Sequence, residues 1–187
     1  MSYEDYWIED ETFIIRGKFY GLSTGLLGGW KKVNYAFNHT VKDEVLENPN
    51  SYVRSVARKF NLKNYFGLLT SVPMSKITIK HCEDVSVFST VGINNPNSPI
   101  GTINIITVLD CRIPRSAMLN AIITITEAKA KALIESGHNF TGTSTDAVII
   151  LTTQRGRYYQ YAGPASELGE KLWETTTECI KDGIKKW

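Results

Sequence analysis

Residues 101–109 read Gly-Thr-Ile-Asn-Ile-Ile-Thr-Val-Leu, and the run from Ile103 to Leu109 is mostly apolar. A strand that is apolar on both faces is typical of the centre of a sheet covered on each side. At its start, Thr102 and Asn104 point to one side of the strand and Ile103 points to the other. This polar pair either faces a pocket or bonds to nearby loop backbone, and the spacing leaves both interpretations open.

Strands and helices are expected on both sides of this segment. The clearest helix is predicted over residues 118–135, where apolar residues recur at helical spacing, and Gly137 follows where a left-handed C-cap belongs. Alternation, turn residues and caps predict the rest: strands over 12–19, 33–41, 65–71, 77–81, 85–91 and 147–151, a helix from Asn50 or Ser51 to about Phe60, a loop over 94–101, and a last helix opened by Pro164. The pattern predicts an α+β fold with a single domain over residues 1–187, a mixed β-sheet covered by helices.

Composition narrows the classes of function. The net charge is +2, so no strong field favours nucleic acid or an anionic membrane as a partner. The most apolar stretches are too short to span a bilayer, and the first five residues lack an apolar signal core. Cysteine occurs at Cys82, Cys111 and Cys179, an odd number at wide spacing, which indicates free thiols and a cytoplasmic location.

Two loops are richer in small polar residues and glycine than folding requires. Residues 23–30 read Ser-Thr-Gly-Leu-Leu-Gly-Gly-Trp between two predicted strands, so Gly28 and Gly29 could let backbone N–H groups approach a ligand. An ordinary turn explains the same residues equally well. Residues 141–146 read Thr-Gly-Thr-Ser-Thr-Asp, a loop able to bind an anion, supply oxyanion donors or present a nucleophile. Taken alone, those residues favour a hydrogen-bonded turn in which Asp146 caps backbone amides.

The predicted helix over 118–135 also carries a polar stripe, formed by Asn120, Thr124, Glu127 and Lys131. Glu127 and Lys131 are four residues apart, which is the spacing of a solvated ion pair. Alternatively, Glu127 faces a pocket and acts as a general base. The direction in which the stripe faces stays open at this stage.

The three histidines, His39, His81 and His138, are not at metal-ligand spacing, and no H-E-x-x-H pattern occurs. The sequence therefore gives no metal-site residue, although a divalent metal held by distant ligands stays open. The G-x-S-x-G motif of a serine hydrolase is also absent.

Several short segments, in this order and spacing, together resemble the adenosylcobinamide amidohydrolase (CbiZ) family from about Leu22 to Gly169. They are Leu22-Ser23-Thr24, Gly28-Gly29, Asn38 with Val41, residues 67–70, Thr90-Val91-Gly92, residues 101–106, Asn120-Ala121, Thr126-Glu127-Ala128-Lys129, residues 142–147, Gly163-Pro164 and Gly169. The chain departs from the family pattern at Trp30, where a third glycine is common, and loosely at residues 71–74. None of the histidines falls on a motif position.

The resemblance implies a cytoplasmic enzyme that cleaves the amide joining a propionate side chain of the corrin ring to aminopropanol. The products would be adenosylcobyric acid and aminopropanol, which in archaea brings scavenged cobinamide into cobalamin biosynthesis. The corrinoid would be the substrate, and no cofactor is expected. The resemblance does not decide whether the enzyme needs a divalent metal or whether it forms a homo-oligomer.

The resemblance and the polar chemistry together suggest roles for the site residues. We expect Glu127 or Asp146 to activate water or a loop hydroxyl, and the segment Gly142 to Thr145 to hold the oxyanion through its backbone and through Thr143, Ser144 and Thr145. The substrate-binding residues would be Gly28, Gly29, Asn38, Thr102, Asn104 and Gly142. The alternatives are a non-catalytic corrinoid-binding protein, a metal-dependent amidase using the histidines, and a structural domain.

Overall fold

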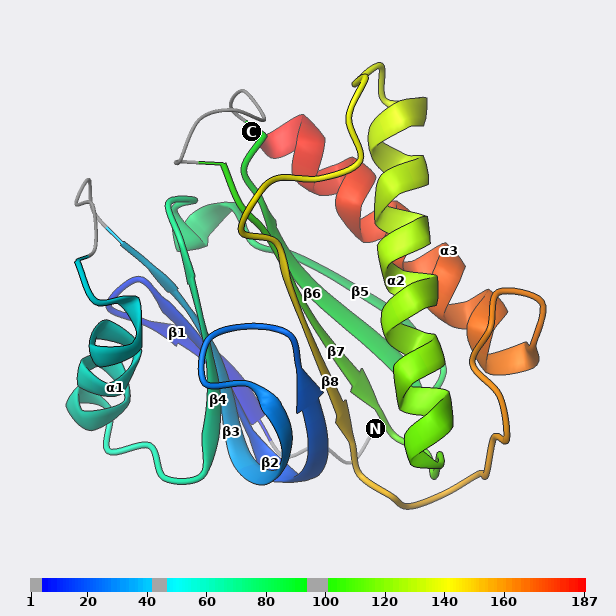
Figure 1. The fold of residues 1–187 in the computed structure, drawn as a ribbon, viewed down its shortest axis with the longest axis horizontal. Coiled ribbons are helices and arrows are strands. Elements are labelled where there is room, and N and C mark those ends of the chain that lie inside the picture. Colours follow the sequence, from blue (N-terminus) through cyan, green and yellow to red (C-terminus); the bar gives the residue numbers. More distant parts are fainter. Residues whose placement is uncertain (1–4, 42–46, 94–100) are drawn as a thin grey trace.

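The computed structural model describes residues 5–41, 47–93 and 101–187 (Figure 1). Within them, eight strands form one sheet in the order β4-β3-β2-β8-β7-β6-β5, and β1 pairs with β2 beside this path. The elements are β1 (Asp5–Glu9), β2 (Thr12–Ser23), β3 (Gly29–Thr40), α1 (Pro49–Lys59), β4 (Tyr65–Thr70), the short 3-10 helix η1 (Met74–Lys76), β5 (Thr78–Cys82), β6 (Val85–Val91), β7 (Ile103–Leu109), α2 (Arg115–Glu135), β8 (Ala147–Thr152) and α3 (Glu167–Lys186).

The sheet is mixed because two of its strand pairs are parallel. Strands β3 and β4 are parallel and are connected through α1, whereas β7 and β8 are parallel and are connected through α2. The other neighbours in the sheet are antiparallel. The predicted α+β fold with a mixed, helix-covered sheet is therefore confirmed, and the run from Ile103 to Leu109 is buried along its whole length as expected of a central strand.

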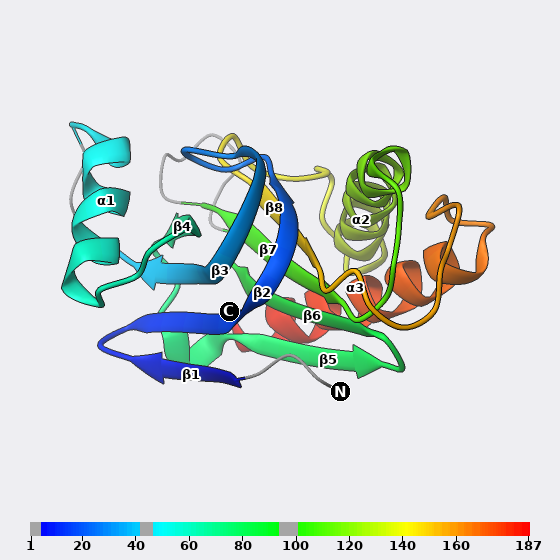
Figure 2. The same cartoon turned by 90° about the horizontal axis from the view of Figure 1, so that it is seen from below.

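The sheet is strongly curled, with helices on its outside (Figures 1 and 2). Helix α1 packs over β2, β3 and β4, and α2 and α3 cover the other half of the sheet. A third apolar cluster is formed by the strands themselves, together with Met74 and Ile77, and joins residues of β2, β3, β4, β6, β7 and β8. Because strands far apart in the sheet order share this cluster, it is the lining of the curled sheet.

Strand β2 makes much of this curvature. Its pairing with β3 shifts register between Arg16 and Phe19, an irregularity that bends a strand and increases its twist. The first half of β2 pairs with β1, and the residues from Tyr20 onward pair with β8. The ring of Tyr6 in β1 meets the ring of Phe88 in β6, with centroids 5.2 Å apart, although β1 and β6 do not pair in the sheet.

Several elements differ from the predictions; among them, β2 continues to Ser23, β3 begins at Gly29 and α2 begins at Arg115. Strand β1 was not predicted: Asp5 to Glu9 is exposed or half-exposed, and its aromatic and apolar residues Tyr6, Trp7 and Ile8 are consecutive rather than alternating. Helix α3 begins at Glu167 rather than at Pro164, since the side chain of Ser166 caps it by accepting from the N–H of Gly169. The cap of α1 is Asn48, not Asn50 or Ser51. The predicted loop over 94–101 falls almost wholly outside the described residues.

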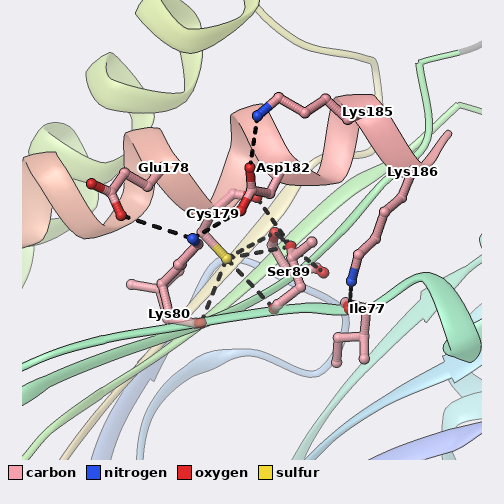
Figure 3. Close-up of polar contacts among 10 residues, drawn as sticks. Ile77, Lys80, Ser89, Glu178, Cys179, Asp182, Lys185 and Lys186 are labelled. Atoms are coloured by element: carbon pink, nitrogen blue, oxygen red, sulfur yellow. Dashed lines mark hydrogen bonds and ion pairs between the residues drawn. The ribbon is translucent and has the colours of Figure 1, made fainter.

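Helix α3 is seated on β5 and β6 through a thiol and a set of ion pairs (Figure 3). The Cys179 thiol is fully buried and lies 3.4 Å from the hydroxyls of both Ser89 and Thr78. At the rim, Lys80 pairs with Asp182 at 2.8 Å. The described part of the chain contains no helix that is long and apolar enough to cross a membrane.

The three cysteines are free thiols, as predicted, and their different burial predicts different reactivities. Burial raises the pKa of Cys111 to about 12 and also raises the pKa of Cys179, whereas Cys82 is partly exposed. Because the thiolate is the reactive form, we expect Ellman's reagent at pH 8 to titrate one thiol promptly in the native protein and three in guanidinium. Rapid reaction of all three in the native protein would contradict this packing.

Candidate functional site

The polar residues singled out in the sequence gather at one end of the curled sheet. Here β3, β4 and β6 end and β7 and β8 begin, so segments distant in sequence meet. The residues brought together are Asn38 and Thr90 near the ends of β3 and β6, Asn104 near the start of β7, and the loop that leads into Ala147 of β8.

A buried cluster of hydrogen-bonded side-chain amides lies at this end of the sheet. The side-chain NH₂ of Asn104 donates to Oδ1 of Asn38 at 2.9 Å and to the backbone carbonyl of Leu69 at 2.8 Å. The NH₂ of Asn38 in turn donates to Oγ1 of Thr90 at 2.8 Å. These contacts join β3, β4, β6 and β7 directly, although β3 and β7 are separated by two strands in the sheet order.

The members of the amide cluster are buried, next to the apolar side chains that line the curled sheet. Asn38 and Asn104 are each 2% exposed, and Thr90 is fully buried. Buried amides of this kind are stable only when their hydrogen bonds are made, so each member depends on the others. The cluster therefore fixes the distance between the two halves of the sheet at the site.

The carboxylate of Asp146 holds the neighbouring loop. Its Oδ1 accepts from the backbone N–H of Ile103 at 2.9 Å and from the hydroxyl of Thr143 at 2.6 Å. Its Oδ2 accepts from the backbone N–H of Thr143 at 3.1 Å and from the ammonium of Lys129 in α2. A carboxylate offers about four acceptor positions, so all of them are occupied here. Asp146 thus has no lone pair left with which to take a proton from water while these bonds persist.

Gly142 makes this ion pair possible. A Cβ at that position would collide with the carboxylate of Asp146 and the ammonium of Lys129. The glycine is therefore explained by the packing of the loop on the ion pair.

The hydroxyls of this loop lie beside the start of β7. Thr102 and Thr145 form a hydroxyl–hydroxyl hydrogen bond, and Thr145 also donates to the carbonyl of Gly101 at 3.3 Å. Ser144 and Thr145 are exposed, whereas Thr143 is half-buried against Asp146. Ser144 and Thr145 are therefore accessible from outside the loop, with the hydroxyl of Thr145 bound to Thr102 and Gly101.

The glycine-containing loop after β2 reaches the same end of the sheet. Thr24 continues the pairing with β8, since its N–H donates to the carbonyl of Val148 at 3.0 Å and its hydroxyl accepts from the N–H of Val148 at 2.9 Å. A Cβ on Gly28 would overlap the carbonyls of Ser23 and Gly25, and Gly29 has a φ of +84°. The geometry of the turn itself accounts for both glycines.

The structure does not bring Glu127 into this arrangement. Lys129 points inward to Asp146, and two residues along an α-helix amount to a rotation of about 200°. Glu127 is accordingly exposed on the outer side of α2. Of the predicted polar stripe, Asn120 and Lys131 are likewise exposed, whereas Thr124 is buried and donates to the carbonyl of Ala162 at 2.7 Å.

From this placement we expect Glu127→Gln to keep the rate of amide hydrolysis within about 2-fold of wild type, as is usual for exposed substitutions away from a site. Steady-state rates of the purified variant test this. A loss of 100-fold in a folded variant would contradict this placement and show that Glu127 takes part in the reaction.

The histidines lie on separate parts of the fold. His39 is bound to Thr12 at 2.7 Å under α1, His81 is bound to Ser86 at 2.8 Å, and the ring of His138 lies tilted against that of Phe140. Over residues 5–41, 47–93 and 101–187, no three histidine, cysteine or acidic side chains converge as a metal site.

Two members of the site were missed as functional residues from sequence. Thr90 and Lys129 belong to segments that carry the family resemblance, but neither was assigned a role. Lys129 did leave a signal, because it lies among Ile125, Ala128 and Ala132 on the apolar face of the helix, where a charge needs a partner. Thr90 left none, since hydroxyls are common in strands.

Comparison with known proteins gives first the class: this α+β protein is an amidohydrolase. The chain belongs to the adenosylcobinamide amidohydrolase family, whose sequence profile matches residues 13–187. An adenosylcobinamide amidohydrolase from Methanosarcina mazei is 38% identical over 194 residues, covering 96% of this chain and 97% of that protein. One from Halobacterium salinarum is 28% identical, covering 88% of this chain and 78% of that protein. An uncharacterised protein from Methanocaldococcus jannaschii is 26% identical.

Proposed function

We propose that this protein hydrolyses the amide between a corrin-ring propionate and aminopropanol in adenosylcobinamide, releasing adenosylcobyric acid for cobalamin salvage. The observation that carries the proposal is family membership over residues 13–187, a range that contains every segment of the candidate site. The M. mazei relative bears this activity in its name and matches along nearly its full length.

The site offers groups suited to this reaction. Amide hydrolysis needs a nucleophile, donors for the developing oxyanion and a proton for the leaving amine. We assign the exposed hydroxyls of Ser144 and Thr145 to the reacting amide, either as donors or as the activated group. The cluster of Asn38 and Asn104 holds β3 and β7 together at the same end of the sheet, and the loop with Gly28 and Gly29 reaches that end.

We also propose that the enzyme acts in the cytoplasm. The support is chemical: all three cysteines are free thiols, as expected of a protein in a reducing compartment. The corrinoid acts as substrate in this scheme, and no cofactor is needed for a hydrolysis.

Incubation of the purified protein with adenosylcobinamide tests the proposal. We expect adenosylcobyric acid and aminopropanol to appear in equal amounts, identified by chromatography and mass. A corrinoid-binding protein without activity would shift the absorption of the corrinoid and leave it intact. A parallel incubation with a chelator addresses the metal-dependent alternative, for which loss of activity restored by zinc would be the signature.

A further inference from the structure

We propose that Lys129 is a positioning residue for the amide hydrolysis: through Asp146, it fixes the loop that carries Ser144 and Thr145 against the start of β7. This inference rests on the proposed function. It concerns a residue that does not itself reach the exposed part of the site.

The first argument is the burial of the charge. The side chain of Lys129 is 9% exposed and that of Asp146 is 12% exposed, so both charges are largely removed from water. Burying such a pair is costly, and a well-packed apolar pair often stabilises a fold as well or better. The surroundings of Lys129 on α2 are apolar, with Ile125, Ala128 and Ala132 fully buried, so a leucine or methionine would suit the packing. A role besides stability explains why an ion pair occupies this place.

The second argument is what the ion pair holds. Asp146 is bound to the backbone of Ile103 and to both the backbone and the hydroxyl of Thr143. It therefore ties the loop to β7 between Thr102, which bonds Thr145, and Asn104, which anchors the amide cluster. The ammonium of Lys129 anchors Asp146, and with it the loop, to α2, a helix of 21 residues that is packed on the sheet.

The third argument is that the loop leaves room for the ion pair at Gly142. Gly142 leaves room for the ammonium and the carboxylate to meet, and a Cβ at that position would have to displace the ends of both side chains. The ion pair is therefore packed directly against the backbone of the loop. Displacing a reacting group by about 1 Å is enough to cost about 100-fold in rate, so a loosened loop affects catalysis before it affects binding.

The test compares Lys129→Met with Lys131→Met, a matched control on the same helix. Lys131 is exposed and pairs only loosely with Glu135, at 3.6 Å. Each variant is checked for folding by circular dichroism and assayed below its melting temperature. For Lys129→Met we expect kcat to fall at least about 10-fold, with KM within about 3-fold of wild type, whereas Lys131→Met keeps both constants.

Lys129→Gln keeps the proposal testable if the methionine variant does not fold. Glutamine retains a donor toward Asp146 without the charge, so we expect a folded protein with an intermediate kcat and an unchanged KM. A folded Lys129→Gln or Lys129→Met with wild-type kcat would overturn the inference, as would a rise in KM alone. Inactivity of the wild-type protein itself would instead overturn the proposed function, which keeps the two failures distinct.

Discussion

Replacement of Asp146 by alanine is expected to lower the free energy of unfolding by about 3–5 kcal/mol, the cost of leaving one partner of a buried ion pair alone. The ammonium of Lys129 would remain buried without its carboxylate. The backbone N–H groups of Ile103 and Thr143 would lose their acceptor in the same step. Thermal or urea unfolding of the purified variant measures the change.

The matched control is Asp5→Ala. Asp5 also forms an ion pair, with Arg16 at 2.6 Å, but both side chains are more than half exposed. Exposed pairs contribute less than about 1 kcal/mol, so this variant should unfold close to wild type. Equal losses from Asp5→Ala and Asp146→Ala would show that the loop is not held by Asp146 as described.

Replacement of Asn104 by aspartate is expected to reduce the rate of amide hydrolysis by about 100-fold. The reason is that it breaks the hydrogen bonds that hold β3 and β4 against the start of β7, beside the loop that carries Ser144 and Thr145. The amide donates to Oδ1 of Asn38 and to the carbonyl of Leu69, and a carboxylate cannot donate to either. The oxygens of Asn38 and Leu69 would then face a carboxylate with no donor between them, and we expect a loss of about 2–4 kcal/mol in the free energy of unfolding. Initial rates with adenosylcobinamide and urea unfolding measure the two effects.

Thr107→Val provides the control on the same strand. Thr107 is buried, and its hydroxyl has no hydrogen-bond partner among the residues that the structure describes. Valine has nearly the same shape without the hydroxyl, so this variant should match or exceed wild-type stability and keep its activity. If Thr107→Val and Asn104→Asp lost activity equally, strand packing in general, and not the amide cluster, would be responsible.

Much of the fold follows from local patterns in the sequence. The mostly apolar run from Ile103 to Leu109 and the helical spacing from Met118 onward are confirmed, because a buried strand and a helix packed on a sheet each leave a pattern of apolar residues. Strand β1 leaves no such signal, since it is an exposed strand whose contact with β6 depends on the curl of β2. A register shift between Arg16 and Phe19 cannot be recognised before the partner strand is known.

The site was predictable as a set of residue types but not as a set of contacts. Asn104 was expected either to face a pocket or to bond nearby backbone, and the structure shows that it meets Asn38 and Leu69 from another part of the sheet. Asp146 was expected to activate a nucleophile or to cap amides, and its four bonds agree with the second interpretation. Helical spacing alone could not tell which of Glu127 and Lys129 faces the loop.

The most direct test of the proposed function is hydrolysis of adenosylcobinamide in water enriched in oxygen-18. Hydrolytic cleavage places one oxygen atom from solvent in the new carboxylate, so the released adenosylcobyric acid should be heavier by the mass of a single label, while the remaining substrate stays unlabelled. Recovery of intact, unlabelled adenosylcobinamide as the sole corrinoid would contradict the assignment.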